Sequence, residues 1–240
     1  MPLADLILGI DTTGPVDSVA LVQQEQPLAT LALRQPVASA RPLLRLIDRL
    51  CRQAGLGLAD IAALAVNVGP GAFTGLRVGL ATAQGLALAY DKPLVGCTAF
   101  EALVALVPYW HGALCPMIQA RKGEVYAALY HRCGEVVQQT RQGVVLTPSA
   151  LCDTIHERTL FLGSGATAYR AELVAALDQR AVCLDIVEAE MGLAVSVARL
   201  GGTRLRTSGA EPLPIPQPLY IRPADARLPR IAAHVAGVRP

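Results

Sequence analysis

Short apolar runs alternate with turn-forming residues through the first half of the chain. Each run is bounded by Gly, Pro, Asp or Asn, the pattern expected of strands in a folded sheet. Residues 39–54 instead repeat apolar positions at helical spacing, with Ser39 as the predicted N-cap and Gly55 as the predicted stop. A further helix is predicted at 99–107. The predicted strands are residues 6–10, 18–22, 28–33, 61–68 and 93–97.

The second half repeats this order of apolar strand, turn, strands and helix, which predicts two related lobes of α/β type. We expect an N-terminal lobe at 1–107, a C-terminal lobe at 108–205, and a Pro-rich tail at 206–240 that returns to the N-terminal lobe. Gly201-Gly202 is predicted to end the last helix. Strands are predicted at 114–119, 124–131, 134–140, 144–146, 160–163 and 181–187, and helices at 147–156, 163–177 and 191–200.

The stretch from Asn67 to Asp91 predicts a strand, a glycine-rich turn and a helix with Thr74 as N-cap. This helix is apolar on nearly all faces, so it must be buried on nearly all faces. Its glycines (Gly75, Gly79, Gly85) indicate that something approaches closely. The chain's own sheet and helices can cover every face, or one face can be kept for another protein chain. We favour the partner surface, because an exposed apolar face would otherwise be a liability.

Composition narrows the class of protein. The chain has 240 residues, 52% of them hydrophobic and 17% charged, which indicates a folded molecule with a sizeable core. A net charge of +2 argues for neither nucleic acid nor membrane. The six cysteines show no CxxC spacing, and neither a signal peptide nor a membrane span is recognisable. We therefore expect a protein of the reducing cytoplasm.

Candidate chemistry is sparse. Asp11, Thr12 and Thr13 follow the first strand, where they could bind phosphate or magnesium or simply close a hairpin. Gly163, Ser164 and Gly165 lie at a strand-to-helix junction that suits an anion or a plain turn. The four histidines form no HxxxH or HExxH pair, so no metal site and no catalytic residue are predicted.

The run Gly-Pro-Gly-Ala-Phe-Thr-Gly-Leu-Arg-Val-Gly at 69–79 resembles the signature of the TsaB (YeaZ) family, as do residues 122–126 and 218–222. The resemblance implies a two-lobed actin-like or sugar-kinase-like fold (ASKHA, RNase H-like), each lobe a mixed β-sheet with flanking helices. In the catalytic members of that superfamily each lobe supplies an acidic residue to the nucleotide's metal. Here the second lobe has Gln119, which counts against ATP hydrolysis by this chain alone.

The resemblance further implies a non-catalytic scaffold in the bacterial tRNA N6-threonylcarbamoyladenosine (t6A) modification complex. Its expected partners are a TsaD-type catalytic subunit and a TsaE-type ATPase, with a homodimer when the chain is alone and with tRNA reached indirectly. No cofactor is required by this chain, although ATP or ADP with magnesium can enter the complex. The alternative is an autonomous nucleotide-binding ATPase or phosphotransferase.

The resemblance also assigns the partner contact to the two helices of the first lobe. Gly79→Arg or Leu80→Asp is then expected to leave the monomer folded and to abolish pairing. The implied interface residues are Leu43, Leu44, Ile47, Leu50, Phe73, Leu76, Arg77, Gly79, Leu80, Ala83, Leu86 and Ala87.

Overall fold

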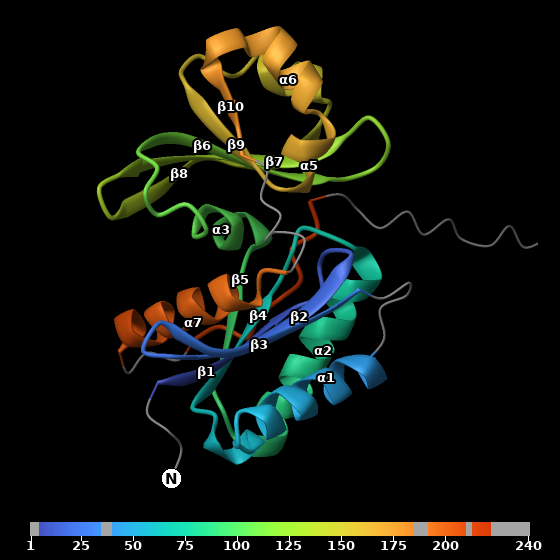
Figure 1. Cartoon of the computed structure of the whole chain (residues 1–240), viewed down its shortest axis with the longest axis vertical. Coiled ribbons are helices and arrows are strands. Elements are labelled where there is room, and N and C mark those ends of the chain that lie inside the picture. The colour runs from blue at the N-terminus through green and yellow to red at the C-terminus, as the bar shows by residue number, and fades with distance from the viewer. Residues whose placement is uncertain (1–4, 35–39, 185–191, 210–212, 222–240) are drawn as a thin grey trace, which may run out of the picture.

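Two five-stranded mixed sheets form the centres of two lobes, which lie one above the other in Figure 1. The computed structural model describes residues 5–34, 40–184, 192–209 and 213–221. Residues of the predicted elements that fall outside these ranges, Ser39 among them, lie outside the described part of the chain.

The first sheet has the strand order β3-β2-β1-β4-β5. The meander β1–β2–β3 is antiparallel. Strand β4 pairs with β1 in parallel, with Ile7 opposite Ala63, and β5 pairs with β4 in parallel, with Leu64 opposite Leu94. All residues of β1 and β4 are buried, as expected of strands covered on both faces. The bounds are β1 Leu6–Asp11, β2 Val16–Gln23, β3 Gln26–Arg34, β4 Ala63–Asn67 and β5 Leu94–Cys97.

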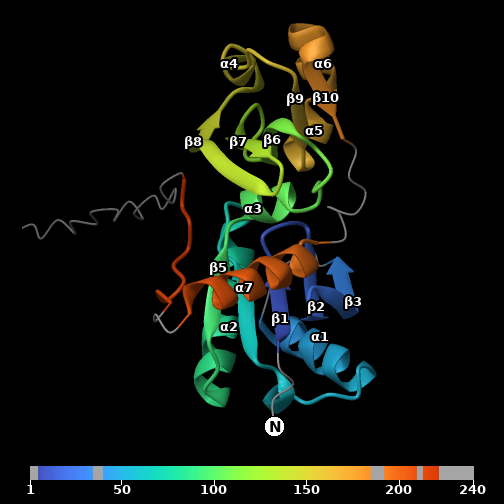
Figure 2. The ribbon, with the colours of Figure 1, turned by 90° about the vertical axis from the view of Figure 1, so that its left-hand side faces the viewer.

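Helices cover both faces of this sheet. Helices α1 (Ala40–Gln53) and α2 (Phe73–Tyr90) pack on one face, where residues such as Leu8 and Val66 meet Leu43, Ile47 and Leu80. Helix α7 (Ala194–Ser208) lies across the opposite face, as Figures 1 and 2 show. A short 3-10 turn, η1 (Leu58–Asp60), leads into β4.

The second sheet has the order β10-β9-β6-β7-β8. One face carries helices α4 (Pro148–Cys152), α5 (Ser164–Ala168) and α6 (Arg170–Leu177) over a core that includes Met117, Phe161 and Leu173. The 3-10 turn η2 (Asp178–Arg180) precedes the last strand. The strands are β6 Gly112–Gln119, β7 Val125–Cys133, β8 Val136–Leu146, β9 Thr159–Leu162 and β10 Ala181–Cys183.

Helix α3 (Ala99–Val104) lies between the lobes (Figure 1). Phe100 and Leu103 of this helix belong to one buried cluster with Leu114 of the second sheet and with Ala198 of α7. The apolar core is therefore continuous from one lobe to the other. The predicted two-lobed α/β fold is confirmed.

Helix α7 departs from the sequence prediction in two ways. It runs through Gly201-Gly202 to Ser208 instead of ending at these glycines. A Cβ on Gly201 would lie 2.5 Å from the Cβ of Ala65, so this position requires glycine for packing and not for a helix end. Glycine here permits close helix–sheet contact. The helix also packs on the first sheet, although the predicted boundary at 205 assigned it to the C-terminal lobe.

Three smaller predictions also need correction. Helix α2 begins at Phe73 after Ala72, whose side chain makes no capping hydrogen bond, so Thr74 is not its cap. The predicted helix 163–177 is split into α5 and α6 at Tyr169, whose backbone is not helical. The two predicted strands after residue 134 form the single strand β8 with irregular register. None of the helices in the described ranges is long and apolar enough to cross a membrane.

Candidate functional site

The carboxyl ends of β1 and β4 bring Asp11 and Asn67 together at the edge of the first sheet. Oδ1 of Asp11 accepts hydrogen bonds from the Thr13 backbone N–H (3.1 Å), the Thr13 hydroxyl (2.7 Å) and the Asn67 amide (2.9 Å). Its Oδ2 accepts from the backbone N–H of Leu193, before α7, at 2.9 Å. Asp11 is 2% exposed, so these internal donors take the place of water. The carboxylate thus ties the turn after β1 to β4 and to the entry of α7.

A second buried carboxyl, Asp17 on β2, lies in the same region. Burial raises the pKa of Asp17 above its usual value, and the negative charge of Asp11 raises it further. The neighbouring Ser18 hydroxyl accepts a hydrogen bond from the Ala194 backbone N–H at 3.3 Å. The Asp11 carboxylate and the Ser18 hydroxyl therefore join β1 and β2 to the start of helix α7.

Thr12 fixes the position of helix α2. Its hydroxyl donates to the carbonyl oxygen of Gly75 at 2.7 Å, and a Cβ on Gly79 would lie 2.2 Å from the same hydroxyl oxygen. The loop before α2 is held too, since the backbone N–H of Ala72 donates to the Thr13 carbonyl at 2.7 Å. The close approach predicted at Gly79 is therefore made by the chain's own Thr12, not by another protein.

The second lobe supplies Gln119 and the Gly163–Gly165 turn. The Ser164 hydroxyl accepts a hydrogen bond from the Gln119 backbone N–H at 3.0 Å, so it holds the end of β6. Gly163 has φ of 98°, and a Cβ there would lie 2.5 Å from the Met117 carbonyl oxygen. Gly163 and Ser164 therefore form a tight turn between β9 and the five-residue helix α5.

The deep space between the lobes is small. A cavity of about 60 Å³ is lined by Asp11, Thr13, Gly14, Ser164 and Gly192 among others. The sequence-predicted nucleotide residues Asp11, Thr13 and Ser164 do meet here, whereas Thr12 is engaged with α2. Such a volume accommodates about two waters but no nucleotide. Within the described ranges no group of three or more His, Cys, Asp or Glu residues could hold a metal ion.

A larger cleft opens outward from this cavity. It has a volume of about 960 Å³ and lies between the turn after β1, the start of α2, the end of β6 and residues 219–221. Its lining includes the exposed Phe73, Arg77 and Tyr220 and the buried Pro70. The size is within the range of about 300–1,000 Å³ that is typical of ligand pockets.

Residues 213–221, which we call the strap, run along the first lobe toward the second (Figure 2). The backbone N–H of Leu219 donates to the Val68 carbonyl at 2.7 Å, and Gln84 donates to the Pro216 carbonyl at 3.2 Å. Nε of Arg77 donates to the Tyr220 hydroxyl at 2.9 Å, and the Arg77 guanidinium lies 3.8 Å from the Phe73 ring centroid. The strap is therefore anchored on α2 by one aromatic–cation cluster.

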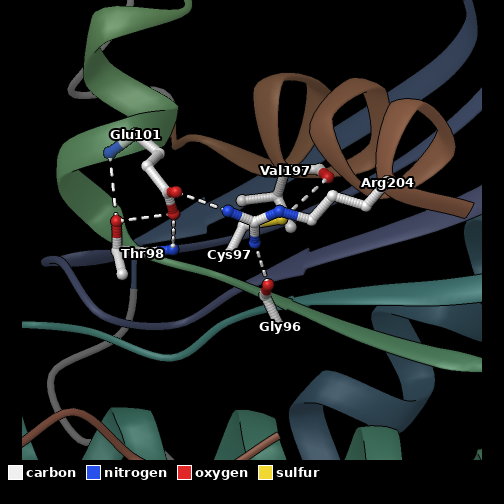
Figure 3. A network of polar contacts seen from close by, with 6 residues as sticks. All are labelled: Gly96, Cys97, Thr98, Glu101, Val197 and Arg204. Carbon is white, nitrogen blue, oxygen red and sulfur yellow. Dashed lines mark hydrogen bonds and ion pairs between the residues drawn. The ribbon is translucent and has the colours of Figure 1, made fainter. Parts of the chain in front are cut away.

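A polar network joins α7 to α3 (Figure 3). Arg204 donates to the Glu101 carboxylate and to the Gly96 carbonyl oxygen. Glu101 also accepts from the backbone N–H and the hydroxyl of Thr98, each at 2.8 Å, which caps α3. Burial raises the pKa of the nearby Cys97 thiol to about 12, so this thiol stays protonated and unreactive.

The predicted partner face divides into buried and exposed residues. Seven of its members are buried within the chain and cannot touch a partner in this conformation: Leu43, Ile47, Leu50, Leu76, Gly79, Leu80 and Ala83. Leu44, Phe73 and Arg77 are exposed, and Leu86 and Ala87 are partly buried against the core. The exposed stripe of α2 comprises Phe73, Arg77, Ala81, Gly85 and Leu88, the last 86% exposed.

Sequence reasoning missed Asn67 and two of the outward-facing residues of α2, Ala81 and Leu88, although it did include Phe73 and Arg77. Asn67 ends β4 beside Asp11, and the meeting of the carboxyl ends of adjacent parallel strands is the signal that could have paired them. Leu88 and Ala81 were hidden because every face of the α2 sequence is apolar.

Comparison with known proteins shows which family the chain belongs to. A family model described as "TsaD: tRNA N6-adenosine threonylcarbamoyltransferase" matches residues 37–201. The tRNA threonylcarbamoyladenosine biosynthesis protein TsaB of Escherichia coli K12 is 38% identical over 128 residues, 52% of this chain and 55% of that protein. The chain belongs to this family, as a TsaB-type (YeaZ) member. The predicted family is confirmed, and the match spans about half the length of the curated TsaB relatives.

Solved structures agree with the TsaB-type assignment over nearly the whole chain. A Pseudomonas aeruginosa protein described as similar to peptidase YeaZ is 26% identical with a TM-score of 0.74, over 92% of this chain and 100% of that chain. YeaZ from Pseudomonas aeruginosa is 27% identical with a TM-score of 0.69 over the same shares. A ROK hexokinase from Thermus thermophilus, 12% identical with a TM-score of 0.52, covers 84% of this chain and 99% of its own, and shares the fold.

Proposed function

We propose that this chain is a non-catalytic subunit of the assembly that makes t6A on tRNA. The observation that carries the proposal is the engagement of Asp11, whose two carboxylate oxygens both accept hydrogen bonds from the chain itself. A carboxylate used in this way braces the fold and is poorly placed to hold a metal–nucleotide complex. The names of the TsaB relatives, tRNA threonylcarbamoyladenosine biosynthesis proteins, supply the pathway.

The proposed partners are a TsaD-type catalytic subunit and a TsaE-type ATPase, with self-association when the chain is alone. Support comes from the family model, which is described by the transferase and matches 37–201 of this chain. Two chains of one fold can pair through equivalent surfaces about a pseudo-twofold axis. In this proposal tRNA, and ATP or ADP with magnesium, enter through the complex, in the cytoplasm.

The surface proposed for the partner is the outer stripe of α2 with the exposed Leu44 of α1. Along the stripe small residues, Ala81 and Gly85, separate Phe73 from Leu88. Small side chains let a facing helix come close, and the larger apolar ones supply burial. The proposed interface therefore keeps only those predicted residues whose side chains are exposed, and adds the other exposed residues of the α2 stripe.

The proposal is tested with Leu88→Asp. Because Leu88 is 86% exposed, the free chain should keep its unfolding free energy within about 0.5 kcal/mol. Burying an unpaired carboxylate in the contact should weaken co-purification with the TsaD-type subunit at least about ten-fold, and reduce t6A formation in a reconstituted system accordingly.

Val174→Asp is the matched control, since Val174 is an exposed apolar residue (46%) on helix α6 of the other lobe. It should co-purify normally. Equal co-purification of the Leu88 variant would contradict the interface, and turnover of ATP–Mg²⁺ by the pure chain without any partner would favour the autonomous enzyme instead.

A further inference from the structure

The outer side of helix α1 carries uncompensated positive charge. Arg45, Arg49 and Arg52 are exposed there, and we call them the arginine face. Arg52 forms an ion pair with Asp48 at 3.0 Å, whereas Arg45 and Arg49 have no ion-pair partner within the described part of the chain. Arg45 and Arg49 are four residues apart, a spacing at which like charges repel one another and destabilise a helix. The fold itself therefore gains nothing from this pair of guanidinium groups.

The charge imbalance covers both helices of the proposed partner surface. Together α1 and α2 contain five arginines and one acidic residue, Asp48, which gives them a net charge of +4. The whole chain has a net charge of only +2, so its remaining residues are net negative. On α2 the single arginine, Arg77, is engaged by Phe73 and Tyr220. The positive charge available to another molecule therefore lies on α1.

The arginine face adjoins the proposed partner surface. Leu44, which belongs to that surface, is 46% exposed and directly precedes Arg45. On the inner side of α1, Leu43 and Ile47 are buried in one cluster with Leu80 of α2, so the two helices lie side by side (Figure 1). A partner that covers Leu44 therefore also comes close to the arginine face.

We propose that the arginine face pairs with acidic side chains of the TsaD-type subunit and opposes pairing with a second copy of this chain. The inference rests on the proposed function, which gives this surface to the partner. In a twofold pair of identical chains the same surface meets itself, so the arginines of the two copies repel one another. An acidic partner is attracted by the same groups, and the choice of partner follows from the difference.

Opposite salt dependences test this inference. Self-association of the full chain is measured by sedimentation equilibrium, and binding to the TsaD-type subunit by surface plasmon resonance. Both are measured at about 0.1 M and about 1 M salt, because the Debye length falls from roughly 10 Å to roughly 3 Å between them. Self-association should tighten as the salt concentration rises, whereas binding to the TsaD-type subunit should weaken.

Removal of the two unpaired charges should act in the same sense. At the lower salt concentration Arg45→Gln/Arg49→Gln should tighten self-association. It should weaken binding to the TsaD-type subunit about five-fold, mainly through a slower association rate. Because both side chains are exposed, urea unfolding of the variant should match that of the unchanged chain.

A charge-reversed copy of the chain provides an acidic partner of known composition. Arg45→Glu/Arg49→Glu is mixed with the unchanged chain, and native mass spectrometry counts the mixed pair and the two self-pairs. The mixed pair should exceed its statistical share, because opposite charges then lie on the two facing surfaces. A statistical distribution of the three species contradicts the proposal.

The matched control is Arg141→Gln/Arg158→Gln, which removes two exposed arginines from the second lobe and changes the net charge equally. It should leave both kinds of pairing and their salt dependences unchanged. If the control and the α1 variant behave alike, the arginine face is an ordinary solvated surface and the proposal is overturned. Weaker self-association or tighter binding to the TsaD-type subunit after removal of Arg45 and Arg49 overturns it too.

Leu88→Asp separates this inference from the proposed function. If Leu88→Asp loses the TsaD-type subunit while Arg45→Gln/Arg49→Gln binds it with unchanged affinity, only the role of the charges is refuted. If Leu88→Asp binds normally, the proposed partner surface itself is wrong.

Discussion

Gly79 and Gly85 occupy the same helix but have opposite surroundings. A Cβ on Gly79 would meet the Thr12 hydroxyl, which itself holds the Gly75 carbonyl, whereas a Cβ on Gly85 would have nothing within 4 Å. The sequence presents both as glycines within an apolar helix and cannot distinguish them. The expected folding of a Gly79→Arg or Leu80→Asp monomer is therefore withdrawn, because both positions are buried in the chain itself.

This difference gives a paired prediction. Gly79→Ala should destabilise the chain by about 1–3 kcal/mol through overpacking against Thr12. Gly85→Ala should stabilise it by up to about 1 kcal/mol, because alanine is the better helix former at an open position. Urea unfolding of both variants measures the change. Equal effects at the two positions would show that Thr12 does not constrain α2.

Helix α7 and helix α3 depend on one another through Arg204 and Glu101 (Figure 3). The two side chains are about one-third exposed, so the ion pair is partly shielded from water and each group has further partners. Arg204→Gln should cost about 1–2 kcal/mol, and a double-mutant cycle with Glu101→Gln should give a coupling of about 1 kcal/mol.

The more exposed pair Arg206–Glu25 is the control for that cycle, with side chains 43% and 57% exposed. Removing it by Arg206→Gln should change the unfolding free energy by less than about 0.5 kcal/mol. If both arginine variants behave alike, the Glu101 network does not stabilise the α3–α7 contact.

At the level of elements, apolar runs predicted β1 and β4 well, because strands buried on both faces must be continuously apolar. The predicted bounds of an element were wrong where a tertiary contact overrides the local sequence signal. Gly201-Gly202 signals a helix end, yet Ala65 and Ile7 of the sheet pack against these glycines and the helix continues. The all-apolar α2 suggested a partner, but most of its predicted contacts are with the chain's own core.

The candidate site was only partly predictable for a similar reason. Asp11 stands out as a carboxylate after a buried strand, but two of its donors, Asn67 and Leu193, are far away in the chain. The cleft likewise joins Phe73, Arg121 and Tyr220 from three distant segments. Spacing along a sequence does not specify such meetings, and only the assembled lobes do.

For the whole molecule, the first lobe is assembled from separated stretches of chain. Its sheet and helices α1 and α2 come from the first hundred residues, while α7 covers the other face from residues 194–208. The second lobe's strands and helices, residues 112–183, are inserted between them. A division at residue 107 therefore leaves one face of the first sheet uncovered.

Expression of residues 1–107 alone should accordingly give an aggregated or unfolded product. Co-expression with residues 192–221, which carry α7 and the strap, should restore a soluble complex because Val197 and Ala198 again cover Ile7 and Ala65. Gel filtration and amide hydrogen exchange measure the rescue. A folded 1–107 fragment with protected β1 amides would show that α7 is dispensable.

The late position of α7 affects how the chain is made. As it leaves the ribosome, β1 to β5 are complete long before residue 194 has been synthesised, and their α7-facing side chains remain uncovered during that time. The inserted lobe has no such delay, since its strands and helices are contiguous. During translation the second lobe should therefore fold before the first lobe is complete. Chaperones should bind mainly to the first sheet, whose α7-facing apolar side chains are still uncovered.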